Sequence, residues 1–385
     1  MNPQATELFA ERNAIRDDLL ALKTPKRVPV FALFTLEAAV GLTGDSLLDC
    51  HYDTALAEKS HAAVCETFYS DALPTYNSRF PSVYDILGSK NWKLGSNGAM
   101  QYSGFEFMSE DEYDEFIAAP YQTILEKFIP RVCSELDADP VKRSLVLAEA
   151  FAEFRQKNAE HFAIYGRLME RFGYSAGVIA GPTTVTPFDF IGDQIRGMNG
   201  IMGDIFRYPD KLEEAVRAVL PSMIRLAAPG ARTDGRWCFI PLHFAPYLNL
   251  KAFQRFYWPL LEQLVVDAEK LGVRSTLFIE NNWTRYLDYL ETLPTSAVGW
   301  VDDGDPVQFT EKFGKDHVFG GFYDPLITLT KSKEECIDEA KRLCDTCMKS
   351  GHFFFTFNKS VMDIKSIDIG KLQAVLEWVR DKAIY

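Results

Sequence analysis

Two ionisable residues, His243 and Glu280, lie near the ends of apolar segments that have the composition of β-strands. The segments are residues 238–244 and 275–281, and residues 250–272 between them have the pattern of an amphipathic helix. Strands alternating with helices of this length predict parallel βαβ units, and closed parallel barrels carry their active sites at the carboxyl ends of the strands. We therefore expect both residues at a catalytic or metal-binding mouth. The alternative is a core histidine and a buried, ion-paired carboxylate.

The same alternation continues along the chain, and it places a third candidate, Asp324, at another strand end. Candidate strands end at Phe34, Asn77, Phe107, Gly181, Phe244, Asn281, Asp302, Asp324 and Asn358. Helical patterns follow Pro187 and cover residues 210–226, 334–348 and 369–382. Nine strands are one more than a (β/α)₈ barrel needs, and those ending at Asn77 and Phe107 have the weakest pattern. We predict an α/β fold, a single TIM-type (β/α)₈ barrel with extra amino-terminal helices, with His243, Glu280 and Asp324 as its catalytic residues.

The length of 385 residues exceeds the roughly 250 of a minimal barrel. The excess is mostly helical, around residues 8–22 and 141–172, and no Ser/Gly linker divides the chain. We therefore expect one domain over residues 1–385, with an amino-terminal helical extension at 1–26 and a helical insertion at 108–173.

Composition argues against several classes of partner. The chain has 54 acidic and 41 basic residues, and no Lys/Arg cluster could neutralise a row of phosphates, so we expect no nucleic acid ligand. The amino terminus is polar, and no apolar run approaches the ~18 residues of a membrane span, so we expect a cytoplasmic protein without membrane contact. Seven cysteines indicate reduced thiols, with the C-x-x-C pair Cys344 and Cys347 as ordinary helix residues.

Three short motifs have structural interpretations. The run from Gly173 to Gly177 matches a nucleophile elbow, but a helical pattern precedes it and a strand pattern follows, so Ser175 is expected in a turn. Ser332 with Glu335, and Ser109 with Glu112, fit capping boxes at helix starts.

Residues 187–200, Pro-Phe-Asp-Phe-Ile-Gly-Asp-Gln-Ile-Arg-Gly-Met-Asn-Gly, are followed by the helix start Tyr-Pro-Asp-Lys at 208–211. Together they resemble the uroporphyrinogen decarboxylase superfamily. The Pro-Leu-His at 241–243, followed by Phe-Tyr-Trp-Pro at 256–259, is similar to the branch that contains corrinoid-dependent methyltransferases. The likeness extends from residue 27 to the last helix. It implies a TIM-type barrel, in agreement with the strand pattern, and an enzyme.

The chain differs from both branches of the superfamily at the positions that bind substrate carboxylates or zinc in those relatives. The resemblance implies an R-Q-A-G-R motif that holds the carboxylates of uroporphyrinogen, but residues 28–44 contain no arginine. A tetra-acidic substrate needs such cations, so its decarboxylation is disfavoured. The methyltransferases bind zinc through His-x-Cys after the fifth strand and a cysteine after the eighth. Here His243 matches, whereas Ala245 and the pair Phe357 and Asn358 replace the thiolates.

These departures leave two interpretations of the metal. Zinc accepts carboxylate oxygen as well as nitrogen, so His243 and Glu280 could hold it with a further aspartate, for which Asp302, Asp303 and Asp324 are the candidates. A metal-free site is the alternative.

The lost thiolates favour the half-reaction in which a methyl group leaves a methyl ether for the cobalt of a corrinoid. Glu280, if its pKa is raised by burial, would give the departing oxygen a proton, and His243 would donate as imidazolium or hold zinc. The chain has no Asp-x-His-x-x-Gly segment, so we expect the corrinoid on a partner protein. The alternatives are a decarboxylase acting on another substrate and a barrel that binds a ligand without turnover.

The predicted strand ends are rich in aromatic residues, which stack on aromatic substrates and exclude water. We therefore expect a small, aromatic methyl donor. The predicted substrate-binding residues are Phe188, Asp189, Arg196, Trp237, Phe244, Tyr247, Trp283, Tyr323 and Asn358. The alternative for the aromatic residues is that they fill the barrel core. Asp193 is expected with Asp189 and Arg196 at the mouth of the site, and the alternative for these three is a structural ion-pair network.

Overall fold

The computed structural model describes residues 2–104, 106–178, 181–228 and 236–385. The chain forms two compact units, each assembled from separated stretches. The first comprises Met1–Ser78, Glu160–Ala180 and Arg274–Tyr385, and the second comprises Arg79–Ala159 and Gly181–Val273. The expectation of one domain with an extension at 1–26 and an insertion at 108–173 stays a prediction.

The first unit is built on parallel strands. They are β1 (Phe34–Thr35), β2 (Thr75–Tyr76), β6 (Val273–Asn282), β7 (Val298–Asp303), β8 (Val318–Gly321) and β9 (Phe353–Phe354). β1 pairs with β2, and β6, β7, β8 and β9 pair in chain order. β8 is buried at every residue, and β7 at all but its last, because parallel strands are covered on both faces.

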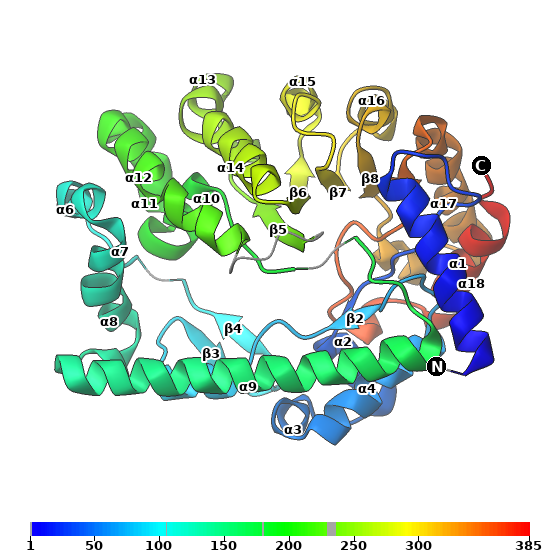
Figure 1. Cartoon of the computed structure of the whole chain (residues 1–385), viewed down its shortest axis with the longest axis horizontal. Coiled ribbons are helices and arrows are strands. Elements are labelled where there is room, and N and C mark those ends of the chain that lie inside the picture. Colours follow the sequence, from blue (N-terminus) through cyan, green and yellow to red (C-terminus); the bar gives the residue numbers. More distant parts are fainter. Residues whose placement is uncertain (1, 105, 179–180, 229–235) are drawn as a thin grey trace. The chain divides into compact units, whose positions relative to one another are not determined.

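Helices connect these strands in the βαβ manner. α15 (Leu287–Leu290), α16 (Pro306–Glu311) and α17 (Lys333–Cys347) follow β6, β7 and β8 in turn, and α16 packs beside α17 (Figure 1). The other helices of this unit are α1 (Pro3–Leu20), α2 (Leu36–Thr43), α3 (Leu47–Tyr52), α4 (Thr54–Thr67) and α18 (Ile369–Lys382). Gly321 has a φ of 121°, and a Cβ there would lie 2.0 Å from the Val301 carbonyl oxygen, so only glycine lets β8 approach β7 this closely.

The second unit combines a small hairpin, one long strand and many helices. The hairpin strands are β3 (Trp92–Leu94) and β4 (Met100–Tyr102), and the long strand is β5 (Arg236–Leu242). Its helices are α5 (Pro81–Leu87), α6 (Tyr113–Ala118), α7 (Pro120–Thr123), α8 (Ile129–Val132), α10 (Pro187–Ile191), α11 (Gly197–Arg207), α12 (Pro209–Ala227), α13 (Leu250–Ala252) and α14 (Trp258–Lys270). α12 packs beside α14 (Figure 1).

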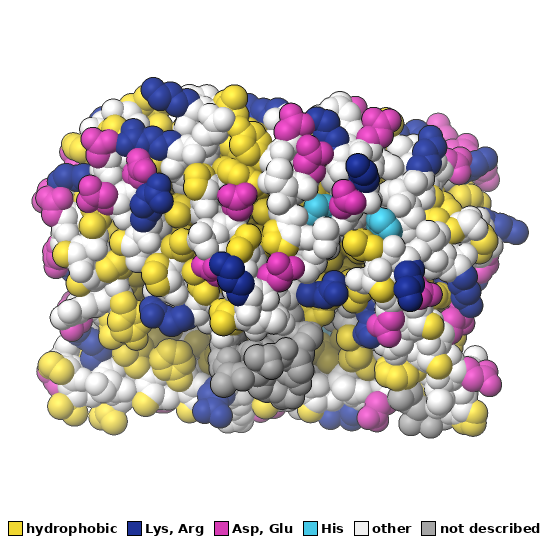
Figure 2. Space-filling model, turned by 45° about the horizontal axis from the view of Figure 1, so that its top comes forward, with side chains coloured by type: hydrophobic (Ala, Val, Ile, Leu, Met, Phe, Trp, Pro, Cys, Tyr) yellow, Lys and Arg dark blue, Asp and Glu magenta, His cyan; other side chains and the backbone are white. Residues whose placement is uncertain are grey.

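One long helix, α9 (Pro140–Phe172), belongs to both units and runs unbroken through Gly166. No helix in the described part of the chain is long and apolar enough to cross a membrane. Figure 2 shows Lys/Arg and Asp/Glu side chains mixed among one another on the face that it displays.

One predicted barrel strand is wrong. The segment ending at Phe107 contains β4, which pairs antiparallel with β3 in the hairpin. The alternation in Met100–Tyr102 is that of a two-stranded ribbon, which sequence pattern alone does not distinguish from a barrel strand. The segment ending at Gly181 includes residues 179–180, which lie outside the described residues.

Most other predicted elements are confirmed. α12, α17 and α18 match the predicted helices within two residues, and capping boxes form at Ser332 and at Ser109. Cys344 and Cys347 are free, buried thiols within α17. Ser175 lies outside any helix, and its hydroxyl donates to the Asp71 carbonyl oxygen at 2.8 Å.

Candidate active site

In the second unit, a buried carboxylate fixes the chain just after β5. Asp189, in α10, is fully buried and accepts hydrogen bonds from the backbone N–H groups of Phe244 and His243, at 2.9 and 3.3 Å. The hydroxyl of Tyr257 donates to the same carboxylate at 2.6 Å. Three donors on one carboxylate hold the backbone of His243 in place. Asp189 therefore has a structural role, because its carboxylate oxygens bind donors of the protein.

Burial sets the ionisation of this pair. Removal from water raises the pKa of Asp189 to about 6, although the hydrogen bond from Tyr257 lowers it. Burial, with the neighbouring Asp189 charge, also raises the pKa of Tyr257 well above its ordinary value. The Tyr257 hydroxyl therefore stays a donor to Asp189 at neutral pH.

His243 forms a dyad with a second aspartate, Asp193. Its Nδ1 lies 2.6 Å from Oδ2 of Asp193, and the side chains are 39% and 26% exposed. A carboxylate at Nδ1 fixes the orientation of the ring and directs its chemistry through Nε2. Neutral His243 would present a lone pair at Nε2. Protonated His243 would donate a proton from that atom, while Asp193 stabilises the imidazolium.

Asp193 lies on a π-helical turn, Gly192–Arg196, between α10 and α11. Such turns disturb the ordinary helical hydrogen bonds and are frequent at functional sites. Two of its carbonyl oxygens accept from outside the helix, that of Asp193 from the Tyr102 hydroxyl at 2.9 Å and that of Ile195 from the Phe107 N–H at 2.7 Å. The segment after β4 therefore supports the turn that carries Asp193.

In the first unit, polar residues gather at the carboxyl ends of β6, β7 and β9. Asp302 is buried and accepts from the Asn281 N–H at 3.0 Å and the Asn358 side-chain amide at 3.3 Å. Lys359 lies 3.1 Å from the same carboxylate. Asn281 has a φ of 58°, an uncommon left-handed conformation that often accompanies functional sites. Glu280, next to it, is half-buried, and its backbone oxygen accepts from the Trp283 indole N–H.

Asp324 has a structural partner. Its carboxylate caps the 3₁₀ helix Pro325–Leu329 by accepting from the Leu326 N–H at 2.9 Å. Asp303 lies at the end of β7, where the Asn282 amide donates to it at 3.3 Å. Asp302 and Asp324 therefore each accept a backbone hydrogen bond within this unit, and the catalytic role expected for Asp324 stays a prediction.

The predicted substrate-binding aromatic residues fall into three groups. Phe188, Phe244, Trp283 and Tyr323 are buried, and the Tyr323 hydroxyl donates to the Cys336 carbonyl oxygen. These four act as core residues, as the alternative from the sequence had it. Trp237 lies at the amino end of β5, the opposite end from His243. Tyr247 is 54% exposed, four residues after His243.

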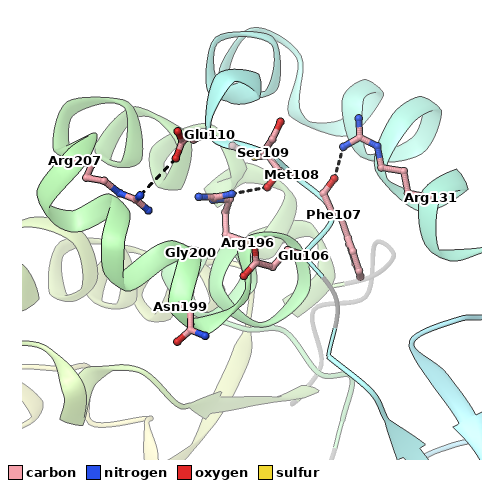
Figure 3. Close-up of a pocket in the computed structure, with 10 residues that line it drawn as sticks. All are labelled: Glu106, Phe107, Met108, Ser109, Glu110, Arg131, Arg196, Asn199, Gly200 and Arg207. Carbon is pink, nitrogen blue, oxygen red and sulfur yellow. Dashed lines mark hydrogen bonds and ion pairs between the residues drawn. The ribbon is translucent and has the colours of Figure 1, made fainter.

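Arg196 lines a cavity of ≈ 530 Å³ within the second unit (Figure 3). Its guanidinium donates to both carboxylate oxygens of the buried Asp204 and to the Met108 carbonyl oxygen. Figure 3 shows two further arginines at this cavity with partners of their own, Arg207 with Glu110 and Arg131 with the Phe107 carbonyl oxygen. Arg196 therefore belongs to a structural ion-pair network, and we leave it out of the proposed site.

The buried arginines of the described chain are all paired. They are Arg12, Arg27 and Arg196. Arg27 binds both oxygens of Asp71 at 2.8 Å, and Arg12 lies 3.6 Å from the same carboxylate. None is left to neutralise several substrate carboxylates, which strengthens the inference from the arginine-free residues 28–44.

The described residues do not supply the ligands that the zinc hypothesis requires. Among the described residues, no three His, Cys, Asp or Glu side chains are gathered so that they could hold a metal ion. The arrangement of the described residues therefore does not fit a zinc ion.

A family model named uroporphyrinogen decarboxylase (URO-D) matches residues 160–381, which is more than half of the chain. The chain belongs to the uroporphyrinogen decarboxylase family. A solved structure, "methyltransferase from Methanosarcina mazei", is similar in fold, with a TM-score of 0.63 and 15% sequence identity over 96% of this chain and 97% of the other. The predicted fold class, an α/β barrel of the TIM type, is thereby confirmed. No curated protein sequence matches this chain.

Within this family member, the prediction from the sequence missed Tyr257 as a candidate site residue, and it placed Asp193 at the mouth of the site without pairing it with His243. A signal for Asp193 was present, since Asp189 and Asp193 are four residues apart and therefore share a helix face before the His243 strand. Tyr257 had no signal, because its contact with Asp189 joins residues that are 68 positions apart.

Proposed function

We propose that this protein is a methyltransferase that removes the methyl group of a small aromatic methyl ether and passes it to the cobalt of a partner corrinoid protein. The observation that carries the proposal is the dyad of His243 and Asp193 at the end of β5. When the methyl group of an ether is displaced, the departing phenolate is a poor leaving group unless its oxygen receives a proton. An imidazolium that is hydrogen-bonded to a carboxylate is suited to supply this proton.

Two further observations are consistent with the proposal. The fold is similar to that of a solved methyltransferase structure, and at 15% sequence identity this similarity concerns the fold alone. The decarboxylase alternative requires cations for substrate carboxylates, and the buried arginines of the described chain are paired with aspartates.

The proposed reaction is a displacement at the methyl carbon. Reduced corrinoid, the second substrate, provides the electron pair that forms the cobalt–carbon bond. The carbon–oxygen bond breaks, its electron pair stays on the phenolic oxygen, and Nε2 of His243 gives that oxygen a proton. The Nδ1 proton stays on His243, hydrogen-bonded to the Asp193 carboxylate, and a proton from solvent returns to Nε2 to restore the imidazolium. Glu280, in the first unit, is the second candidate for proton donation.

The test uses the purified protein, 2-methoxyphenol and free cob(I)alamin, with the cobalt spectrum reporting methylcobalamin. His243→Ala should lower kcat by roughly 10²–10⁴-fold, the usual contribution of a positioned acid. Asp193→Asn should lower it by about 10–100-fold, as expected for a group that orients a histidine. Glu280→Gln is measured in parallel.

Matched controls come from exposed carboxylates. Asp137→Asn and Glu311→Gln should leave the rate unchanged, because both side chains are exposed and lie away from the strand ends. If kcat falls strongly in Glu280→Gln and is unchanged in His243→Ala, Glu280 is the proton donor instead of His243. Release of carbon dioxide from a carboxylated substrate without corrinoid, and no methylcobalamin from methoxylated aromatics, would replace the proposal with a decarboxylase.

A further inference from the structure

The hairpin that the sequence suggested as a barrel strand carries a group of aromatic rings. Trp92 pairs with Tyr102 across β3 and β4, and their ring centroids are 5.0 Å apart. Tyr84, from α5, lies 6.0 Å from Trp92, and the Arg79 guanidinium lies 4.1 Å from the Trp92 centroid. We call Trp92, Tyr102 and Tyr84 the hairpin aromatic cluster. Figure 1 shows β3 and β4 as a separate ribbon of the second unit.

This cluster is joined directly to the catalytic dyad. The Tyr102 hydroxyl donates to the Asp193 carbonyl oxygen at 2.9 Å, and the Asp193 carboxylate binds Nδ1 of His243 at 2.6 Å. Two hydrogen bonds therefore separate the Tyr102 ring from the imidazole. The π-helical turn makes this connection, because it redirects the Asp193 carbonyl oxygen to an outside donor.

The hairpin is held firmly although its strands have only three residues. An isolated ribbon of this size is marginally stable, so its position depends on outside contacts. The Ser89 hydroxyl accepts from the Trp92 N–H at 3.1 Å, and the Lys90 N–H donates to the Val132 carbonyl oxygen at 2.8 Å. After β4, the Phe107 N–H donates to the π-helical turn. Trp92 and Tyr102 are thus presented on a fixed support.

Tyr102 is 41% exposed as a residue, and Trp92 is half-buried. By contrast, Phe188 and Phe244 are buried in the core, whereas Phe190, three residues before Asp193, is partly exposed. Accessible rings near the dyad in chain or by contact thus include Tyr102 of the hairpin, Phe190 of α10 and Tyr247 on the loop after His243, and of these Tyr102 is hydrogen-bonded to Asp193. Such rings bind a flat aromatic molecule by offset or edge-to-face stacking.

Resting on the function proposed above, we propose that the hairpin aromatic cluster binds the aromatic ring of the methyl donor. Trp92 and Tyr102 then determine the preference for methoxylated aromatics over aliphatic methyl donors. Tyr102 has a second role as a positioning residue, because its hydroxyl holds the Asp193 backbone. The substrate class is a single ring that carries a methoxy group.

The test compares an aromatic donor, 2-methoxyphenol, with an aliphatic donor, 2-methoxyethanol, in methyl transfer to cob(I)alamin. Trp92→Leu and Tyr102→Leu should each raise KM for 2-methoxyphenol by roughly 3- to 10-fold, the loss expected for one stacked ring. KM for 2-methoxyethanol should not change. Tyr102→Phe keeps the ring and should lower kcat while leaving KM for 2-methoxyphenol as it was. Tyr121→Leu is the matched control, since Tyr121 is 67% exposed elsewhere on the same unit.

Calorimetric titration of 2-methoxyphenol, without corrinoid, separates this inference from the proposed function. If the wild-type protein transfers no methyl group, the proposed function fails, whereas weaker binding in Trp92→Leu than in wild type still supports the cluster as the binding surface. If the wild-type protein transfers the methyl group and both leucine variants bind 2-methoxyphenol as wild type does, the inference is overturned. Equal rises in KM for both donors would also overturn it, because selection between substrate classes would be absent.

Discussion

Replacement of Tyr257 by phenylalanine tests the buried support of the dyad without touching His243 or Asp193. The change removes one hydroxyl, which donates to Asp189 at 2.6 Å, and it preserves the ring. Asp189 keeps two backbone donors, from Phe244 and His243. A hydrogen bond to a charged group contributes about 1.5–3 kcal/mol, so the variant should lose stability of that order at neutral pH.

The pH dependence gives this prediction a definite sign. Burial raises the pKa of Asp189 to about 6, against roughly 3.9 in an unfolded chain. The folded protein therefore binds this proton more tightly than the unfolded chain does. The associated stability is fully present below about pH 4 and is lost as the pH rises through about 6. Two pKa units correspond to about 3 kcal/mol.

The hydrogen bond from Tyr257 lowers this pKa, so Tyr257→Phe should raise it further above 6. The stability of the variant should then continue to fall between pH 6 and pH 8, where that of the wild type has levelled. The difference between the two proteins should be small at pH 5 and approach its full size at pH 8.

Urea unfolding at pH 5, 6, 7 and 8, followed by circular dichroism, measures this difference. Tyr121→Phe is the control, because Tyr121 is exposed and belongs to the same unit. A stability loss of the same size at every pH would refute the reasoning, since it would show that the hydroxyl does not act on the charged carboxylate. No loss at any pH would refute the hydrogen bond itself.

Two further predictions concern the ion-pair network and the metal. Arg196→Ala should destabilise the protein by about 3–5 kcal/mol in urea unfolding, because the buried Asp204 loses the guanidinium that binds both of its oxygens and keeps the exposed Arg207 at 3.7 Å. Arg217→Ala removes an exposed pair and should cost less than about 1 kcal/mol, and equal losses would contradict the network. The purified protein should hold well below one equivalent of zinc by elemental analysis, in wild type and His243→Ala alike, since the described residues offer no three-ligand group. One equivalent in wild type that disappears in His243→Ala would restore the zinc hypothesis.

The sequence predicted the strands and helices that have long, regular patterns. β6 and β7 could be predicted from their continuous apolar runs, and α17 from its amphipathic periodicity, because each pattern reflects burial within a single element. The β3–β4 hairpin was not, because a three-residue strand looks the same whether its partner is parallel or antiparallel. Its pairing depends on the turn at residues 95–99, which closes through the hydrogen bond from the Gly95 N–H to the Ala99 carbonyl oxygen.

The candidate site was predictable only in part. The position of His243 after β5 follows from the apolar run before it, but its partner depends on how a helix 50 residues earlier is wound. A π-helical turn has no reliable sequence signal, since it shifts the hydrogen bonds by one residue without changing composition. Aromatic residues at strand ends were equally ambiguous. Tyr323 and Tyr247 have the same residue type, yet one is buried and the other is half exposed.

The π-helical turn connects the parts of the proposed chemistry. One residue on it, Asp193, contributes both of its polar groups, the carboxylate to His243 and the backbone oxygen to Tyr102. The proposed proton donor, His243, and the proposed aromatic surface, through Tyr102, are therefore both hydrogen-bonded to the same residue, Asp193. A substrate ring bound to the hairpin would be held at a fixed distance from Nε2 of His243, and such positioning accounts for a large share of catalysis. Under the proposed function, this arrangement would let stacking next to a proton donor recognise the substrate without the arginines and thiolates that the family resemblance implies and this chain lacks.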